Sequence, residues 1–192
     1  MGIFQQLLVR IAKALEKANI SYMVIGGQAV LVHGRPRFTG DIDITLGVDV
    51  DNLPRLRKIA EELSLEAIPK DVEKLAKQTN VFPVKDPATN IKVDFVFSFS
   101  PYEQDAIKRA QPTEIDGVKV YYASAEDTVI HKMVAGRPID ISDVKSIVNL
   151  RSKIDRNYIV KWLKVYSEIL ARDLIKDYQE IEKQVSQSKG KQ

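Results

Sequence analysis

The chain of 192 residues has no cysteine, only two histidines and no long apolar run. Without cysteine, disulfide bonds, thiolate catalysis and cysteine-ligated zinc are excluded. A metal site built on His33 and His131 is not expected, because packing is the usual role of a single histidine on a helical face. No segment reaches the length of a membrane span and the N-terminus lacks a secretory signal. We therefore expect a cytoplasmic protein that does not enter the membrane.

The overall composition is that of a globular chain with a modest excess of positive charge. Apolar residues make up 44% of the sequence and charged residues 29%, and the formal net charge is +3. This charge permits a polyanionic partner without requiring one. The order of helix and strand patterns along the chain predicts an α/β core over residues 1–123, a helical segment packed on it over residues 124–185, and a mobile polar tail over residues 186–192.

Hydrophobic periodicity and turn residues predict alternating helices and strands. Helices are predicted over residues 3–15, 28–33, 53–63, 72–78, 101–110, 124–136, 140–151 and 156–183. Strands are predicted over residues 22–26, 41–46, 80–84 and 91–99, with a hairpin over 114–121 that turns at Asp116-Gly117. The predicted fold class is therefore α/β (α+β): a mixed, twisted sheet flanked by helices and followed by a helical C-terminal segment.

Two acids stand one residue apart in the second predicted strand. Residues i and i+2 of a strand point to the same face, so Asp41 and Asp43 should lie side by side, with Ile42 and Ile44 on the opposite face. Adjacent carboxylates repel each other, and a divalent cation removes that conflict. Mg²⁺ in proteins is usually held by one or two carboxylates together with substrate phosphates, so this pair indicates a metal site for phosphoryl chemistry.

A third acid interrupts the most β-prone segment of the chain, residues 91–97. A charged residue in such a strand is rarely buried without a partner, and that residue is Asp94. If this strand pairs beside the strand of Asp41 and Asp43, three carboxylates converge. Such a set suffices for a two-metal site that activates an attacking oxygen and stabilises a leaving one.

A glycine pair, Gly26-Gly27, ends the first predicted strand and opens a short helix. Glycines at such a turn let backbone N–H groups approach phosphate oxygens closely. The sequence therefore predicts a phosphate site and a metal site in the same part of the chain.

The glycine pair, the acid-x-acid strand and the later strand acid together resemble the DNA polymerase β-like nucleotidyltransferase superfamily. The fuller string, from Gly-Gly-Gln-Ala to Arg-Phe-Thr-Gly-Asp-Ile-Asp, is similar to the small prokaryotic branch that includes AbiEii toxin-type nucleotidyltransferases. The resemblance covers roughly residues 20–150 and implies transfer of a nucleoside monophosphate from an NTP to a hydroxyl. The acceptor could be an RNA, a protein or a small molecule, and a toxin–antitoxin system with a cognate partner protein could be involved.

The resemblance also implies residue roles. Asp41 and Asp43 would ligate Mg²⁺ or Mn²⁺ at the triphosphate, and Asp94 would join the metal shared with the attacking hydroxyl or act as its base. The other matching positions are Gly26, Gly27, Arg37, Thr39 and Lys132 for nucleotide and phosphate binding, and Asp143 for catalysis.

Each of these other roles has a structural alternative. Lys132 could snorkel at a helix surface, and Asp143 could be an acid favoured by a helix dipole. Thr39 could cap its loop or bond to the Asp41 backbone, and Arg35 could be a solvated loop residue or contact phosphate.

One position departs from the superfamily pattern. Many active members carry serine after the first glycine, where this chain has Gly27 and then Gln28. Phosphate binding would then rest on backbone N–H groups and basic side chains. This departure motivates a second hypothesis, a catalytically inactive member that binds a nucleotide or a partner.

Overall fold

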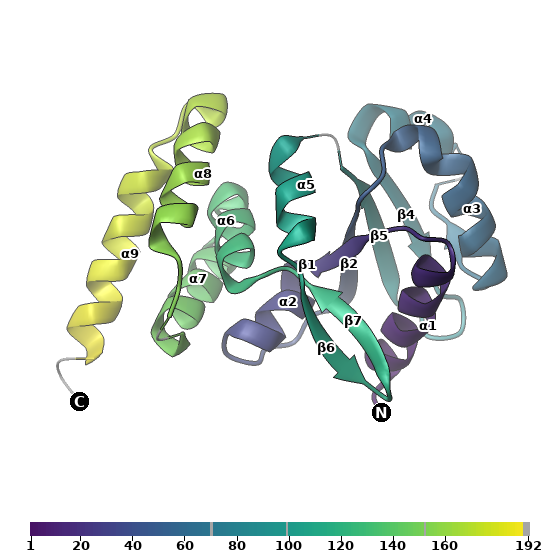
Figure 1. Ribbon diagram of the computed structural model, residues 1–192, viewed down its shortest axis with the longest axis horizontal. Coiled ribbons are helices and arrows are strands. Elements are labelled where there is room, and N and C mark those ends of the chain that lie inside the picture. The colour runs from purple at the N-terminus through teal and green to yellow at the C-terminus, as the bar shows by residue number, and fades with distance from the viewer. Residues whose placement is uncertain (70, 99, 152, 190–192) are drawn as a thin grey trace. The chain divides into compact units, whose positions relative to one another are not determined.

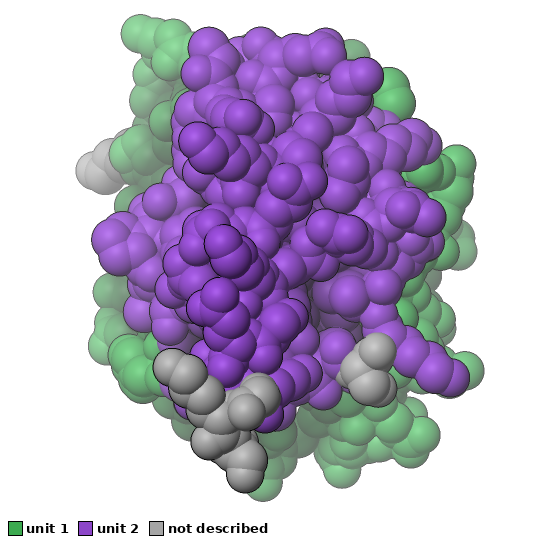
Figure 2. All heavy atoms as spheres, turned by 90° about the vertical axis from the view of Figure 1, so that its left-hand side faces the viewer, with its two compact units in different colours: residues 1–28, 38–123 green, residues 29–37, 124–192 purple. Residues whose placement is uncertain are grey.

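The computed structural model describes residues 1–69, 71–98, 100–151 and 153–189. Residue 99 of the predicted strand and residues 190–192 of the predicted tail therefore lie outside the described residues. The chain forms two compact units. The first comprises Met1–Gln28 and Phe38–Ala123, and the second comprises Ala29–Arg37 and Ser124–Gln192 (Figure 2).

The first unit is built on a seven-stranded mixed sheet with the order β3-β4-β5-β2-β1-β7-β6 (Figure 1). Its strands are β1 (Tyr22–Ile25), β2 (Asp41–Leu46), β3 (Glu66–Ala67), β4 (Val81–Lys85), β5 (Lys92–Phe97), β6 (Gln111–Ile115) and β7 (Val118–Tyr122). β2 pairs with β5 and β1 pairs with β7 in parallel, whereas β1–β2, β3–β4, β4–β5 and β6–β7 are antiparallel. The mixed sheet confirms the predicted fold class.

One face of the central strands is fully apolar. Ile42 and Ile44 of β2 lie opposite Val93 and Phe95 of β5, and all four are completely buried. Because side chains alternate along a strand, the residues between them must project from the other face. The apolar alternation therefore fixes which side chains can meet on that second face.

Helices cover the sheet through amphipathic faces. α1 (Ile3–Lys17) contacts β7, α3 (Leu53–Glu62) contacts β3, α4 (Val72–Thr79) contacts β4 and α5 (Pro101–Lys108) contacts β2. α1 buries Leu7, Ile11 and Leu15, which follow helical spacing. A short 3-10 helix, η1 (Val50–Asn52), and the two-residue strand β3 had no counterpart among the predicted elements.

The β6–β7 hairpin turns where its sequence predicts. Asp116 and Gly117 both have positive φ, +51° and +72°. Two central residues with positive φ are required by the type I′ turn, whose twist suits a two-residue hairpin.

The second unit is helical and comprises α6 (Ala125–Ala135), α7 (Pro138–Leu150), α8 (Arg156–Leu170) and α9 (Leu174–Lys189). α6 contacts α7 and α8, and α9 contacts α7 and α8. The residues 29–37 that join this unit include the end of α2 (Gly26–His33). Arg151 holds this end, because its Nη2 donates to the Val32 carbonyl at 2.7 Å.

The prediction of one helix over residues 156–183 is wrong. The helix breaks at Ala171, whose φ is +50°, and α9 starts three residues later. Asp173 accepts a hydrogen bond from the backbone N–H of Lys176, which satisfies one of the free donors at a helix start. The Asp before an apolar run was a start signal within the sequence. α9 then continues to Lys189, into the stretch for which a mobile tail was predicted.

In the described part of the chain, no helix is both long enough and apolar enough to cross a membrane.

Candidate functional site

The acids of β2 and β5 share one face of the sheet. Asp43 lies directly opposite Asp94, and Asp41 lies opposite Lys92, in the parallel β2–β5 register. Asp41 is exposed, whereas Asp43 and Asp94 are partly buried. We call the surface formed by Asp41, Asp43 and Asp94 the acid face. Strand alternation puts Asp41 and Asp43 on one face, and the pairing of β2 with β5 then sets Asp94 beside Asp43.

A lysine lies against this acid face. Lys92 Nζ is 2.8 Å from Asp94 Oδ2, and that hydrogen bond, with the charges of Asp94, Asp43 and Asp41, raises the pKa of Lys92. The second oxygen of Asp94, Oδ1, is buried and has no hydrogen-bond partner among the described residues. An unsatisfied buried carboxylate oxygen is costly, and binding a cation or a proton donor would remove that cost.

Both glycines of the predicted phosphate turn are required by side chains packed against them, Gly26 by Asp43 of the acid face and Gly27 by Thr39. Gly26 has a φ of +64°, and a Cβ there would lie 2.0 Å from Asp43 Oδ2. A Cβ on Gly27 would lie 2.3 Å from Thr39 Oγ1. The turn therefore brings the start of α2 against Asp43 and Thr39 with no space for side chains. The first backbone N–H groups of a helix lack intrahelical partners, so they are free to meet an anion.

Thr39 and Gln28 flank Asp41 from the loop and from the helix. Thr39 Oγ1 donates to Asp41 Oδ1 at 3.0 Å, a contact with the carboxylate that differs from both structural alternatives, a loop cap and a bond to the Asp41 backbone. The Gln28 side chain is buried, and its Nε2 lies 3.5 Å from the Asp41 carbonyl oxygen. Gln28 thus has a structural contact at the position that departs from the superfamily pattern.

The acid face fits a hard divalent cation by its chemistry. Its donors are all carboxylate oxygens, which Mg²⁺ prefers, and Asp94 Oδ1 has an unmet acceptor position. The described residues hold no group of three or more Asp, Glu, His or Cys side chains already drawn together tightly enough to hold a metal ion.

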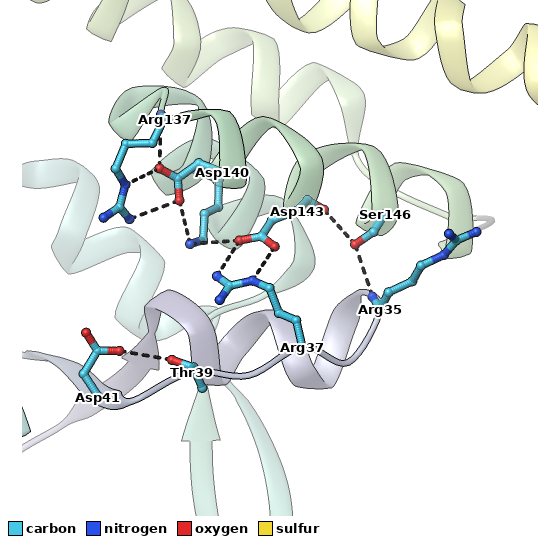
Figure 3. A network of polar contacts seen from close by, with 9 residues as sticks. Arg35, Arg37, Thr39, Asp41, Arg137, Asp140, Asp143 and Ser146 are labelled. Atoms are coloured by element: carbon cyan, nitrogen blue, oxygen red, sulfur yellow. Dashed lines mark hydrogen bonds and ion pairs between the residues drawn. The ribbon is translucent and has the colours of Figure 1, made fainter. Parts of the chain in front are cut away.

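The second unit holds a different cluster, which we call the ion-pair network: Arg37, Lys132, Arg137, Asp140 and Asp143 (Figure 3). Lys132 Nζ lies 2.8 Å from Asp140 Oδ1 and 3.1 Å from Asp143 Oδ2. Lys132 is only 4% exposed, Asp140 0% and Asp143 4%. Lys132 is therefore a buried ion-pair partner, in contrast to the surface snorkelling that was its structural alternative.

Arginines complete the network from both sides. Arg37 donates from Nε to Asp143 Oδ1 and from Nη2 to Asp143 Oδ2, both at 2.8 Å. This forked pair raises the pKa of Arg37. Arg137 Nε donates to Asp140 Oδ2 at 2.6 Å. Burial alone would raise the pKa of Asp140, but the hydrogen bonds from Arg137 and Lys132 outweigh it and lower that pKa.

The expected site residues thus fall into two groups. The first unit brings together Gly26, Gly27, Thr39, Asp41, Asp43 and Asp94, and the second unit brings together Arg37, Lys132 and Asp143. Sequence reasoning missed Lys92 and Asp140. Lys92 could have been found from its place two residues before Asp94 on the same strand face. Asp140 could have been found from the Arg137-Pro138 start of α7, where an acid at the third helical position bonds back to the cap.

The sequence matches the family described as "Nucleotidyltransferase of unknown function (DUF6036)" over residues 2–186. The chain belongs to this family. No curated protein matches the chain.

Solved structures agree with the family assignment at the level of the fold. An antigenic nucleotidyltransferase-like protein from Paracoccidioides brasiliensis is similar with a TM-score of 0.58 and 17% identity, over 93% of this chain and 91% of that one. The antibiotic-resistance factor ANT(2'')-Ia gives a TM-score of 0.51 and 14% identity, over 97% and 92%. The lincosamide antibiotic adenylyltransferase LnuA, solved with lincomycin, gives 0.50 and 16%, over 74% and 96%.

Proposed function

We propose that this family member transfers a nucleoside monophosphate from an NTP to an acceptor hydroxyl and releases pyrophosphate, with Mg²⁺ or Mn²⁺ as cofactor. The observation that carries the proposal is the β2–β5 register, which sets Asp43 opposite Asp94 with Asp41 one step along the same face. The glycine turn that packs directly on Asp43 supports a phosphate site beside these acids. Membership of a nucleotidyltransferase family supports the reaction class.

In the proposed reaction, the acceptor oxygen forms a bond to the α-phosphorus while the bond from that phosphorus to the pyrophosphate oxygen breaks. The metal, held by Asp41, Asp43 and Asp94, would supply charge neutralisation at the triphosphate. Asp94 would either share the metal with the attacking hydroxyl or accept its proton, since Asp94 Oδ1 is a buried carboxylate oxygen without a partner among the described residues. Thr39 holds the Asp41 carboxylate in place, and the N–H groups at Gly26 and Gly27 contact phosphate oxygens.

The ion-pair network supplies positive charge for the nucleotide in this proposal. Arg37 is the phosphate contact, since its side chain is partly exposed while it is oriented by Asp143. Lys132 is held by Asp140 and Asp143, so it contacts phosphate only if one of these ion pairs opens, and otherwise it orients Asp143. Asp143, for which the resemblance implies a catalytic role, would act in this proposal as a positioning residue that fixes the Arg37 guanidinium.

The proposed branch of the superfamily, the location and the partner rest on the sequence resemblance. We propose the AbiEii toxin-type branch, a cytoplasmic location and a role in a toxin–antitoxin system with a cognate protein partner. The acceptor is an RNA, a protein or a small molecule. The similar structures include a lincosamide antibiotic adenylyltransferase, which keeps small molecules among the candidates.

Transfer of label from each α-³²P-labelled NTP, in the presence of Mg²⁺, tests this function. RNA, protein and small-molecule pools are offered separately, and the Asp43→Asn variant serves as control. We expect one pool to take label from the parent and none from the variant. If no pool takes label although the protein binds MgNTP, transfer is not the function.

That last outcome would support a second candidate, an inactive member that binds nucleotide or a partner. Two contacts favour it. The Gln28 side chain is committed to the Asp41 carbonyl, and Asp94 already has a cationic partner in Lys92. Nucleotide binding without label transfer, unchanged in Asp94→Asn, is the result expected from this candidate.

A further inference from the structure

A hollow of about 440 Å³ lies within the second unit, next to the ion-pair network. Its volume falls in the range of about 300–1,000 Å³ that is usual for ligand sites. Three segments line it: the loop of Arg35 to Arg37, one face of α7 that includes Lys145 and Asn149, and the last turns of α9 that include Lys189. The site proposed above does not use this hollow beyond Arg37.

The charge of the lining is strongly one-sided. Arg35, Arg37, Lys145 and Lys189 line the hollow, and Asp143 is the one carboxylate among the described lining residues. Both oxygens of Asp143 are already bound, to Arg37 and to Lys132. Positive potential therefore remains uncompensated in a concave surface, where field lines are focused.

The lining also lacks the aromatic and large apolar side chains that would bind bases or apolar groups. None of the described residues that line the hollow is aromatic, and Pro36 and Val185 are its only apolar members within that part of the chain. Without aromatic rings, a ligand cannot be held by base stacking. Charged and amide side chains instead suit phosphate oxygens.

The fold holds the loop of this hollow in a defined place. The backbone N–H of Arg35 donates to Ser146 Oγ at 3.2 Å, and Arg37 is clamped on Asp143. Figure 3 shows the Arg35 side chain extending away from Asp143 and past Ser146. A lysine in the last turn of a helix is favoured by the helix dipole alone, which would account for Lys189. Arg35 lies in a loop, so the dipole does not account for it.

We propose that this hollow binds the phosphodiester backbone of an RNA acceptor. The inference rests on the proposed function, whose acceptor class it narrows. An RNA supplies both a terminal hydroxyl and a row of phosphates, whereas a polycationic small molecule such as an aminoglycoside would be repelled by four cations. Binding through phosphates is independent of base sequence and falls steeply with salt.

The test is fluorescence anisotropy with a labelled single-stranded RNA of twelve nucleotides, without NTP. The test variant is Arg35→Gln/Lys145→Gln. The matched control is Lys164→Gln/Lys176→Gln, which removes two exposed cations of the same unit that do not line the hollow. We expect the test variant to bind RNA roughly tenfold or more weakly, and the salt dependence of log K to become shallower by about 1.4, at about 0.7 per lost contact on a single strand. The control should bind within twofold of the parent.

Equal RNA binding by the parent and the test variant would overturn the inference. Label transfer keeps this failure separate from that of the proposed function. If the parent labels RNA and the test variant labels it equally well, the inference fails and the function stands. If the parent transfers no label but its RNA binding requires Arg35 and Lys145, the function fails and the hollow remains an RNA site.

Discussion

On the acid face, three carboxylates share one side of two strands and Lys92 pairs with Asp94, whereas in the ion-pair network two carboxylates are held by three cations. Every oxygen of Asp140 and Asp143 accepts at least one bond from a cation. On the acid face, Asp94 Oδ1 is buried and accepts none from the described residues. Aspartate oxygens are thus all paired in the network, whereas one oxygen of Asp94 on the acid face has no partner among the described residues.

From this difference in charge pairing we expect the ion-pair network to contribute mainly to stability and the acid face mainly to activity. A fully paired buried network is expensive to break, because removal of one partner leaves an uncompensated charge. A carboxylate cluster carries a repulsive cost that a bound cation would remove, and such clusters are common at functional sites. Substitutions in the network should therefore cost stability, and substitutions on the acid face should cost activity.

The largest expected effect is on the acid face. Asp43→Asn should lower label transfer by roughly ten-thousand-fold or more, about 5.4 kcal/mol in transition-state stabilisation, because the amide keeps the shape but cannot hold the metal. Its melting temperature should equal that of the parent or exceed it, since a repulsion is removed. Asp51→Asn, an exposed acid on η1, is the matched control. A variant that melts far below the parent would make Asp43 a structural acid.

The ion-pair network should give the opposite pattern. Lys132→Met should reduce the free energy of unfolding by about 3 kcal/mol, near the lower limit for a broken buried pair because Asp140 and Asp143 each keep an arginine. Urea denaturation measures this, and Lys164→Met is the control, with an expected change below about 0.5 kcal/mol. Stability within 1 kcal/mol of the parent would show that the network does not depend on Lys132.

Arg37 belongs to the network and is also proposed to contact the triphosphate, so its substitution should affect both stability and nucleotide binding. Arg37→Ala should weaken NTP binding by about 1.5–3 kcal/mol, with a smaller loss at high salt. Asp143→Asn keeps the guanidinium and should retain NTP binding while it loses stability. If both variants lose stability equally and neither changes the binding isotherm, Arg37 serves only the network.

The smallest effect concerns acid pH. The pKa of Asp140 is lower in the folded protein than in the unfolded chain, so its stabilisation is complete above the unfolded value of about 3.9. It is lost as the pH falls through the folded value. Unfolding free energies measured between pH 7 and pH 2.5 should therefore drop below about pH 4, and less steeply in Asp140→Asn. Identical pH profiles for the parent and the variant would show that ionisation of Asp140 does not contribute to stability.

The acid face could be largely predicted from sequence because strand alternation is a local property. Asp41 and Asp43 share a face by spacing alone, and the apolar run around Asp94 indicated a central strand beside them. The strand register itself, and the clash that a Cβ on Gly26 would make with Asp43, depend on tertiary structure.

The ion-pair network was harder to predict from the sequence, because its contacts join residues that are far apart in the chain. Lys132 meets Asp140 and Asp143 across two helices, and Arg37 arrives from a loop more than a hundred residues earlier in the chain. Nothing local to Lys132 distinguishes a buried ion pair from a surface lysine. The sequence also placed residues 29–37 with the core, whereas contacts such as those of Arg37 and Arg151 group them with the C-terminal helices.

The most direct test of the central claim, that the acid face holds a metal and an NTP together, is isothermal titration calorimetry of each NTP with and without Mg²⁺. Metal alone should bind weakly and MgNTP more tightly, because the phosphates complete the coordination shell. EDTA should abolish the gain, and Asp43→Asn should show none. NTP affinity that is the same with Mg²⁺, with EDTA and in the variant would contradict the account.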